Sequence, residues 1–269
     1  MNIEVYAPKN IELKKYIKCF YVLNHSKTDE TTSYFTFPSI FSIVSIISNV
    51  KINQTSTEVI IEESNTNNFI SGLNAKFTKP LLVEYQGNIK EITTYFNPLG
   101  INAFLENPLN KYCHKQNSQF IPFSDYQKAM QKILEIDNNT NLLSELEKYW
   151  LEKLKEFKHH FLKKAVQSIL INPETSISNI AQKNHISHKT LIEQFKKHIC
   201  KTPTEFRKIV RFRKALKNNT NSLTELSYLA NYFDQAHMIK DFKSLTGYTP
   251  RDFFNNLSSK QGIINWIYK

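Results

Sequence analysis

The stretch that decides the fold is residues 177–206, ISNIAQKNHISHKTLIEQFKKHICKTPTEF, because it returns as residues 223–253, LTELSYLANYFDQAHMIKDFKSLTGYTPRDF. Matching positions are 46 residues apart before a central turn and 47 residues apart after it. Self-similarity at a fixed spacing indicates two copies of one supersecondary unit. Each copy has two segments of helical apolar spacing around a short polar turn, so we expect helix, turn and helix twice.

Capping residues set the bounds of these helices. In the first copy, a short helix over residues 177–184 is followed by Ser187, which caps a second helix to about residue 199. In the second copy, Ser222 and Glu225 form the pattern of a capping box, and Asp234 caps a helix to about residue 246. His185 and Asn231 occupy the turns, where a left-handed backbone normally favours Gly.

Each unit is followed by a signal for a new helix. Thr202-Pro203-Thr204-Glu205 and Thr249-Pro250-Arg251-Asp252 both place a Thr cap, a Pro at the first helical position and an acid at the third. The first of these helices, residues 203–217, is long and basic, which suits a rigid spacer between the units. Two recognition helices on one spacer would reach successive major grooves about 34 Å apart.

The charge of the chain supports binding to a polyanion. Of its 35 Lys and Arg and 24 Asp and Glu, residues 1–156 hold 16 and 17, whereas residues 157–269 hold 19 and 7. The net charge of +11 is therefore a basic C-terminal region of +12 attached to a nearly neutral one. This asymmetry is the electrostatic pattern of phosphate binding. Taken alone, the charge is also explained by solubility, by an acidic partner or by a membrane surface. A helical repeat that binds proteins explains the periodicity and the caps, but not the charge.

The C-terminal residues also resemble a known family. From about residue 158 to 257 the chain is similar to the AraC/XylS family of bacterial transcription regulators, and the match is carried by Ser178-Asn179-Ile180-Ala181, Thr202-Pro203-x-x-Phe206, Arg211-Phe212-Arg213-Lys214-Ala215-Leu216, Tyr232 to Lys243, and Thr246-Gly247-Tyr248-Thr249-Pro250. The resemblance implies a cytoplasmic regulator that binds double-stranded promoter DNA, most often as an activator that touches RNA polymerase. Its N-terminal domain would sense a small-molecule effector or form a homodimer. Residues 96–105 look similar to a sensor-type domain found in part of this family.

Carried over position by position, the resemblance places base contacts on both recognition helices. The expected base-contacting residues are His188, Lys189, Ile192, Glu193, Gln235, Ala236, His237 and Lys240. The expected phosphate contacts are Lys196, Lys197, Arg211, Lys243 and Arg251. Gln235 could hydrogen-bond adenine through two atoms, and Lys240 could contact guanine or a phosphate. Ile192 could meet a thymine methyl or be partly buried.

Three positions depart from the family pattern. Cys200 stands where the second copy has Gly247, at a helix end that favours Gly, so we expect strain there. Asn231 and Ser227 replace the usual Gly and Ala of the second unit.

The N-terminal half is rich in short β-prone segments. The predicted strands are residues 3–6, 20–23, 41–47, 59–61, 81–85 and 89–96. We also expect an amphipathic helix over residues 11–20 and a short helix from the turn at residue 97 to residue 105. The predicted organisation is multidomain: an α+β, β-rich sensor or dimerisation domain over residues 1–125, a helical connector over 126–156, and an all-α DNA-binding domain over 157–269. The connector could equally pack on its own domain.

Other classes of protein are disfavoured. No Gly-rich phosphate loop or nucleophile motif occurs, so we expect no catalytic residues, no cofactor and no enzyme activity. The pairs His185 with His188 and His159 with His160 lack further ligands, so we expect no metal site. The three cysteines, Cys19, Cys113 and Cys200, are scattered and are expected to be free thiols, and neither a membrane span nor a secretory signal is predicted. Two alternatives remain for the N-terminal half, a protein-interaction module or an unrecognised enzyme domain.

Overall fold

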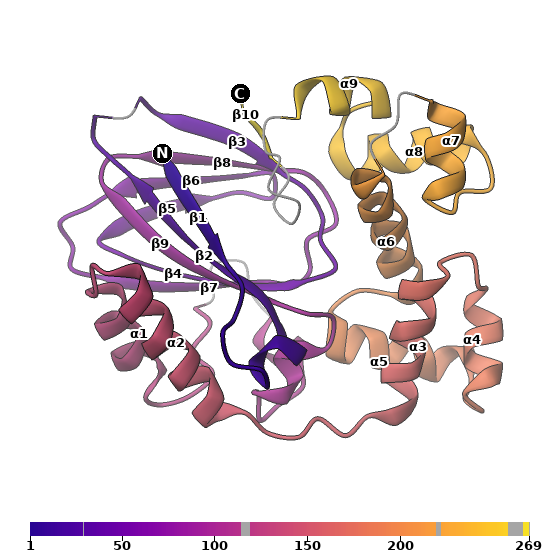
Figure 1. Cartoon of the computed structure of the whole chain (residues 1–269), viewed down its shortest axis with the longest axis horizontal. Helices are drawn as coiled ribbons and strands as arrows, with labels where there is room; N and C mark the ends of the chain where they lie inside the picture. The colour runs from indigo at the N-terminus through magenta and orange to yellow at the C-terminus, as the bar shows by residue number, and fades with distance from the viewer. Residues whose placement is uncertain (29, 114–118, 219–221, 258–265, 269) are drawn as a thin grey trace.

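The computed structural model has a β-rich N-terminal part and a helical C-terminal part (Figure 1). It describes residues 1–28, 30–113, 119–218, 222–257 and 266–268. The predicted multidomain class, an α+β region followed by an all-α region with two helix-turn-helix units, is confirmed.

Two five-stranded sheets form the N-terminal part. The first has the strand order β1 (Asn2–Tyr6), β2 (Ile17–His25), β9 (Ile89–Phe96), β4 (Ser42–Ser48) and β7 (Phe69–Asn74). The second has the order β10 (Trp266–Tyr268), β3 (Thr32–Thr36), β8 (Leu81–Gln86), β6 (Glu58–Glu63) and β5 (Val50–Gln54). Neighbouring strands in both sheets are antiparallel except for β6 and β8, which are parallel.

Strand β2 shows how the layers are built, because its side chains alternate between two cores. Phe20 and Val22 pack with the helices α1 (Tyr126–Leu134) and α2 (Asn139–Lys153), which cover the outer face of the first sheet. Tyr21 and Leu23 point the other way and pack in the core that includes residues of the second sheet. A sheet buried on both faces explains why this strand is apolar along most of its length.

The predicted connector over residues 126–156 belongs to the N-terminal core. Its two helices share one apolar cluster with strands of the first sheet, and Trp150 packs edge-on against Phe96 and Phe104, with ring centroids 5.0 and 5.3 Å apart. The segment is therefore a layer of the N-terminal domain. This agrees with the alternative stated above, that the connector packs on its own domain.

The predicted helix over residues 11–20 is wrong. Only the 3-10 turn η1 (Leu13–Lys15) forms there, and strand β2 begins at Ile17. A strand forms from Ile17 instead of a helix because β2 pairs with β1 on one side and β9 on the other. This pairing satisfies the hydrogen-bonding groups of its backbone along its length. Strands β3, β5 and β7 were not predicted, and residues 97–105 form the 3-10 turn η2 (Gly100–Ala103) rather than an α-helix.

The C-terminal part contains seven described helices, listed here in chain order: α3 (His160–Ile171), α4 (Ile177–Lys183), α5 (His188–Ile199), α6 (Pro203–Lys217), α7 (Leu223–Leu229), α8 (Gln235–Thr246) and α9 (Pro250–Asn256). Helices α3, α4 and α5 gather at one end of α6, and α7, α8 and α9 gather at the other (Figure 1). Each group has its own apolar cluster.

Helix α6 belongs to both clusters through different faces. Phe206 and Val210 pack into the first unit, whereas Ile209, Phe212 and Ala215 pack into the second. One continuous helix therefore supplies core residues to two units, as expected of the spacer that its length and basicity predicted.

The end of the chain returns to the N-terminal part. Strand β10 pairs with β3, and Trp266 is buried with its ring stacked on Tyr34 at a centroid distance of 3.9 Å. Residues 266–268 thus complete the second sheet instead of extending the C-terminal helices, although the predicted domain of 157–269 includes them. Among the described helices, none has the length and apolar content to cross a membrane.

Candidate nucleic-acid interface

Each recognition helix begins at the predicted cap. Ser187 Oγ accepts a hydrogen bond from the Thr190 amide at 3.0 Å, and Asp234 Oδ1 accepts one from the His237 amide at 2.7 Å. These bonds satisfy amides that a helix start leaves without an intrahelical partner. The caps fix where α5 and α8 begin, and therefore which side chains lie in their first turns.

The turns before these helices have the predicted left-handed residues. His185 has a φ of 54° and Asn231 a φ of 61°. At the far end of α5, Cys200 is left-handed at a φ of 60°, matching Gly247 at 81° after α8. The two units therefore share one backbone path, and in the first unit a residue with a side chain takes the strained position.

Both recognition helices turn one face inward and another outward. Leu191, Phe195 and Ile199 of α5 are buried in the first unit, and Met238, Phe242 and Leu245 of α8 are buried in the second. The predicted contact residues that are exposed are His188, Lys189, Glu193, Lys196 and Lys197 on α5, Ala236, Lys240 and Lys243 on α8, and Arg251 on α9. The outward faces are thus polar and mostly basic.

Three predicted base contacts are only half exposed. Ile192 is partly covered, and Gln235 donates from Nε2 to Thr224 Oγ1 on α7 at 2.5 Å. His237 lies half-buried, with its ring nearly perpendicular to that of Tyr232 and the ring centroids 5.5 Å apart. For Gln235 to bind a base, its amide has to leave Thr224, which requires the rotation of this one half-exposed side chain. That these residues contact bases stays a prediction.

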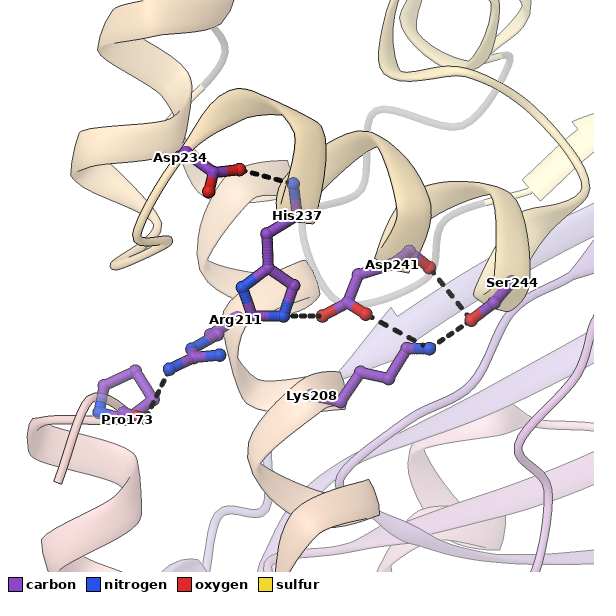
Figure 2. Close-up of polar contacts among 7 residues, drawn as sticks. All are labelled: Pro173, Lys208, Arg211, Asp234, His237, Asp241 and Ser244. Carbon is purple, nitrogen blue, oxygen red and sulfur yellow. Dashed lines mark hydrogen bonds and ion pairs between the residues drawn. The ribbon is translucent and has the colours of Figure 1, made fainter. Parts of the chain in front are cut away.

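A polar cluster holds α8 against the spacer helix (Figure 2). The carboxylate of Asp241 is buried on the inner side of α8; Lys208 Nζ of α6 lies 3.2 Å from one of its oxygens, and His237 Nε2 lies 3.6 Å from the other. Lys208 also donates to Ser244 Oγ. The sequence analysis did not predict this cluster. The feature that could have revealed it is an acidic residue, Asp241, on the inward face of α8 together with a lysine, Lys208, on the spacer helix. It fixes how α8 is rotated on α6.

Arg211 is placed differently from the expectation. Its side chain is buried, and Nη2 donates to the Pro173 carbonyl at 3.1 Å (Figure 2). The guanidinium also lies over the Tyr232 ring at 5.7 Å. A phosphate contact from Arg211 does not fit this position, because the charged group joins the first unit to the second instead of facing solvent.

The hollow between α3 and α4 adds basic residues that the repeat did not indicate. It is lined by Lys163, Lys164, Gln167, Ser168, Lys183 and Asn184 and has a volume of about 580 Å³. Three lysines around one hollow form an electropositive surface on the first unit. Lys163 and Lys164 precede the first copy of the repeat, so the repeat itself gave no reason to single them out.

The spacer is also anchored to the N-terminal part. Arg213 of α6 donates to the Phe37 carbonyl at 2.7 Å and to the Pro38 carbonyl at 2.9 Å. Burial lowers the pKa of Arg213 to about 10. Phe37 itself is buried in the apolar cluster of the second unit, with its ring 4.9 Å from that of Phe253. The helical part is therefore docked on the N-terminal part through its spacer.

Comparison with known proteins identifies the helical part. Residues 180–256 match the model of a family described as a helix-turn-helix domain. A search of curated proteins gave no match.

Among solved structures, ToxT from Vibrio cholerae O395 is similar at a TM-score of 0.37 and 11% identity, over 94% of this chain and 96% of that one. Unsaturated fatty acid bound wild-type ToxT from Vibrio cholerae strain SCE256 gives 0.39 and 11%, over 87% and 94%. Similarity this low transfers neither ligand nor mechanism to this chain. The residues matched by the family model span both helix-turn-helix units of the structure. The C-terminal region is an AraC-type helix-turn-helix domain of a DNA-binding regulator.

Proposed function

We propose that this chain binds a two-block promoter site in double-stranded DNA through α5 and α8 and regulates transcription there. It acts by binding DNA and not by catalysing a reaction, and it acts in the cytoplasm. The observation that carries the proposal is the pair of capped helices on one rigid spacer, each with a buried apolar face and an exposed polar face. Helices arranged in this way suit successive major grooves on one face of DNA.

The positions of two lysines on α8, Lys240 and Lys243, favour different roles. Lys240 lies one helical turn after Ala236 on the exposed face, where a base edge is within reach of a recognition helix, whereas Lys243 lies near the end of the helix. We assign Lys240 to a base contact and Lys243 to a phosphate contact. Base contacts specify sequence, and phosphate contacts add affinity for any sequence.

A matched set of variants tests these assignments. Binding to a selected DNA site and to its single-base variants is measured by fluorescence anisotropy over a range of salt concentrations. Lys240→Ala should flatten the preference at one base pair by about 1–3 kcal/mol. Lys243→Ala should weaken binding to all sequences and reduce the salt slope by about 0.9. Lys51→Ala, which removes an exposed lysine of β5, is the control and should change neither.

Two outcomes count against the proposal. If all three variants bind as the parent does, α8 does not contact DNA. If Lys240→Ala weakens every sequence alike, Lys240 contacts a phosphate and the base assignment is wrong.

We propose further that the second unit activates transcription by contacting RNA polymerase. Tyr228 and Leu229 of α7 and Phe233 of the turn are 81%, 41% and 93% exposed, an unusual exposure for large apolar side chains that lie close together in sequence. Tyr228→Ser with Phe233→Ser should leave DNA affinity unchanged and lower transcription from a target promoter. Ile171→Ser, which removes a side chain 67% exposed on α3, is the matched control. Equal transcription by both variants would exclude this contact.

For the N-terminal part, we propose that a small polar molecule supplies the signal. A hollow of about 570 Å³ lies at one end of the sheets. Apart from Ile89, its lining combines amide, hydroxyl, imidazole and charged side chains, which belong to Asn24, His25, Ser48, Asn49, Glu63, Ser64, Asn65, Asn67, Asn88 and Lys90. Such a lining suits a ligand with several hydrogen-bonding groups. Thermal shifts with a panel of sugars and amino acids test this, with Glu63→Gln as the variant that should lose the shift. An unchanged melting temperature across the panel favours a protein partner as the signal.

A further inference from the structure

Two cysteines 87 residues apart meet where the first recognition helix ends on the N-terminal part. Cys113 ends the 3-10 turn η3 (Leu109–Tyr112), and Cys200 ends α5. Their Sγ atoms are 3.2 Å apart, and both side chains are half-buried. Helix α5 packs directly on η3, so the two thiols sit inside a contact between the regulator's two parts.

The surrounding contacts hold these residues in register. Asn102 donates from Nδ2 to the His198 carbonyl at 2.9 Å, and its Oδ1 lies 3.0 Å from His198 Nδ1. Lys201, which follows Cys200 and is buried, donates to the Ala75 carbonyl of the N-terminal part. The thiols are therefore flanked on both sides by polar contacts that cross the same interface.

The geometry points to a modification site: we propose that Cys113 and Cys200 form a disulfide under oxidising conditions and thereby tie the first helix-turn-helix unit to the N-terminal part. A disulfide has an S–S length of about 2.0 Å, so the bond requires only a small closing movement from the present 3.2 Å. Cys200 has the left-handed backbone of a helix end and directly follows α5, the helix that packs on η3.

The charge around the pair favours reaction at Cys200. A hydrogen bond with Cys113 and the nearby cations of Lys201 and Lys76 lower the pKa of Cys200. The same hydrogen bond raises the pKa of Cys113, so Cys113 keeps its proton when Cys200 ionises. A thiolate next to cations is the nucleophile in disulfide exchange.

With oxidised glutathione as the oxidant, the exchange has two steps. The Cys200 thiolate attacks one sulfur of oxidised glutathione, forms a mixed disulfide and releases one glutathione thiolate. Cys113 then loses its proton, attacks the Cys200 sulfur and releases the second glutathione. In sum, two protein thiols become one disulfide, and one oxidised glutathione becomes two reduced molecules.

The disulfide has a mechanical consequence for DNA binding, which rests on the proposed function. Helix α5 and helix α8 share one spacer, and both must settle into their grooves together. A covalent tie at the end of α5 removes the freedom of the first unit to move on the N-terminal part. Oxidation should therefore lower the affinity for a two-block site by about tenfold. A change of this size lies within the usual range of allosteric effects on affinity.

The first experiment maps the cross-link in the full chain. The protein is treated with oxidised glutathione, remaining thiols are alkylated, and non-reduced peptides are analysed by mass spectrometry. We expect one peptide that joins Cys113 to Cys200, with Cys19 alkylated after unfolding. Cys19 is the control because it is buried, and burial raises its pKa to about 12. Cys113→Ser should abolish the cross-link and Cys19→Ser should retain it. Absence of the joined peptide from the oxidised parent would overturn the proposal.

The second experiment compares the DNA affinity of reduced and oxidised protein. The parent and Cys19→Ser should bind about tenfold more weakly after oxidation, whereas Cys113→Ser should bind equally well in both states. Equal affinity of the oxidised and reduced parent would refute the restriction of α5 by the disulfide. Failure of the reduced parent to bind any DNA would instead refute the proposed function, since the peptide map tests the disulfide without DNA.

Discussion

Acid should loosen the contact between α5 and the N-terminal part through one buried histidine. His198 Nδ1 lies 3.0 Å from Asn102 Oδ1, and its ring packs 5.2 Å from Phe157 and 5.1 Å from His159, measured between centroids. Since Asn102 Oδ1 can only accept, His198 Nδ1 carries a proton and donates to it. Burial, followed by the charges of His159 and Lys197, lowers the pKa of His198 from 6.5 to about 4.

The size and sign of the effect follow from this shift. Between pH 6.5 and about 4 the unfolded chain binds a proton at residue 198 and the folded chain does not. The contribution to stability is therefore fully present above pH 6.5 and falls as the pH drops through this window. At 1.36 kcal/mol for each pH unit, the loss is about 2 kcal/mol at pH 5 and about 3 kcal/mol near pH 4.

The assay is urea unfolding at pH 7 and pH 5, followed by tryptophan fluorescence. His198→Asn keeps a hydrogen-bond donor near the position of Nδ1 but does not titrate, so the parent should lose about 2 kcal/mol more than this variant between the two pH values. The exposed His188, changed to Asn, is the control and should behave like the parent. Equal losses for the parent and His198→Asn would show that His198 is not the titrating group and would refute the reasoning.

Other substitutions test the elements that build the domain, each by urea unfolding. His185→Gly should raise stability by about 1 kcal/mol because it relieves a left-handed backbone; Asn231→Gly should gain less, since Asn231 Oδ1 accepts from Lys214 at 3.1 Å, and equal gains would contradict this. Thr202→Ala should cost about 1–2 kcal/mol by removing the capping box of α6, and no cost would show that the cap is dispensable. Trp266→Ala should lower the stability of the N-terminal part by about 3–5 kcal/mol, seen in the fluorescence of the remaining tryptophan, whereas an unchanged unfolding curve would mean that β10 contributes little.

The helices of the two repeat copies and the spacer between them were predictable because their signals are local. Caps at Ser187, Thr202 and Asp234, and left-handed turns at His185 and Asn231, act within a few residues of where they occur in the chain. The 46-residue repeat added a second check, since each copy had to fold in the same way. Local and repeated signals agree here, and the helix bounds follow within a residue or two.

The N-terminal part was only partly predictable because its structure depends on distant pairing. Strand β3 has β8 on one side and β10 on the other, and no pattern within β3 reveals those partners. The segment over residues 11–20 has helical apolar spacing, but pairing of β2 with β1 and β9 decides its conformation. The return of Trp266 to the second sheet is likewise a long-range contact.

The candidate site shows the same division. The exposure of Lys189, Lys240 and Lys243 follows from helical periodicity, since each lies off the apolar face. The burial of Arg211 could not be deduced, because it depends on a carbonyl of Pro173 and a ring of Tyr232 that the fold brings together.

The most direct test of the central claim is a selection of bound sequences from a random DNA pool by the full-length reduced protein near physiological salt. Two recognition helices on one spacer predict a single enriched motif with two short blocks about one helical turn, or 10–10.5 base pairs, apart. A doubled copy of that motif would add that the protein binds as a homodimer. Binding without enrichment of any sequence, or enrichment of one block alone, would contradict recognition by both α5 and α8.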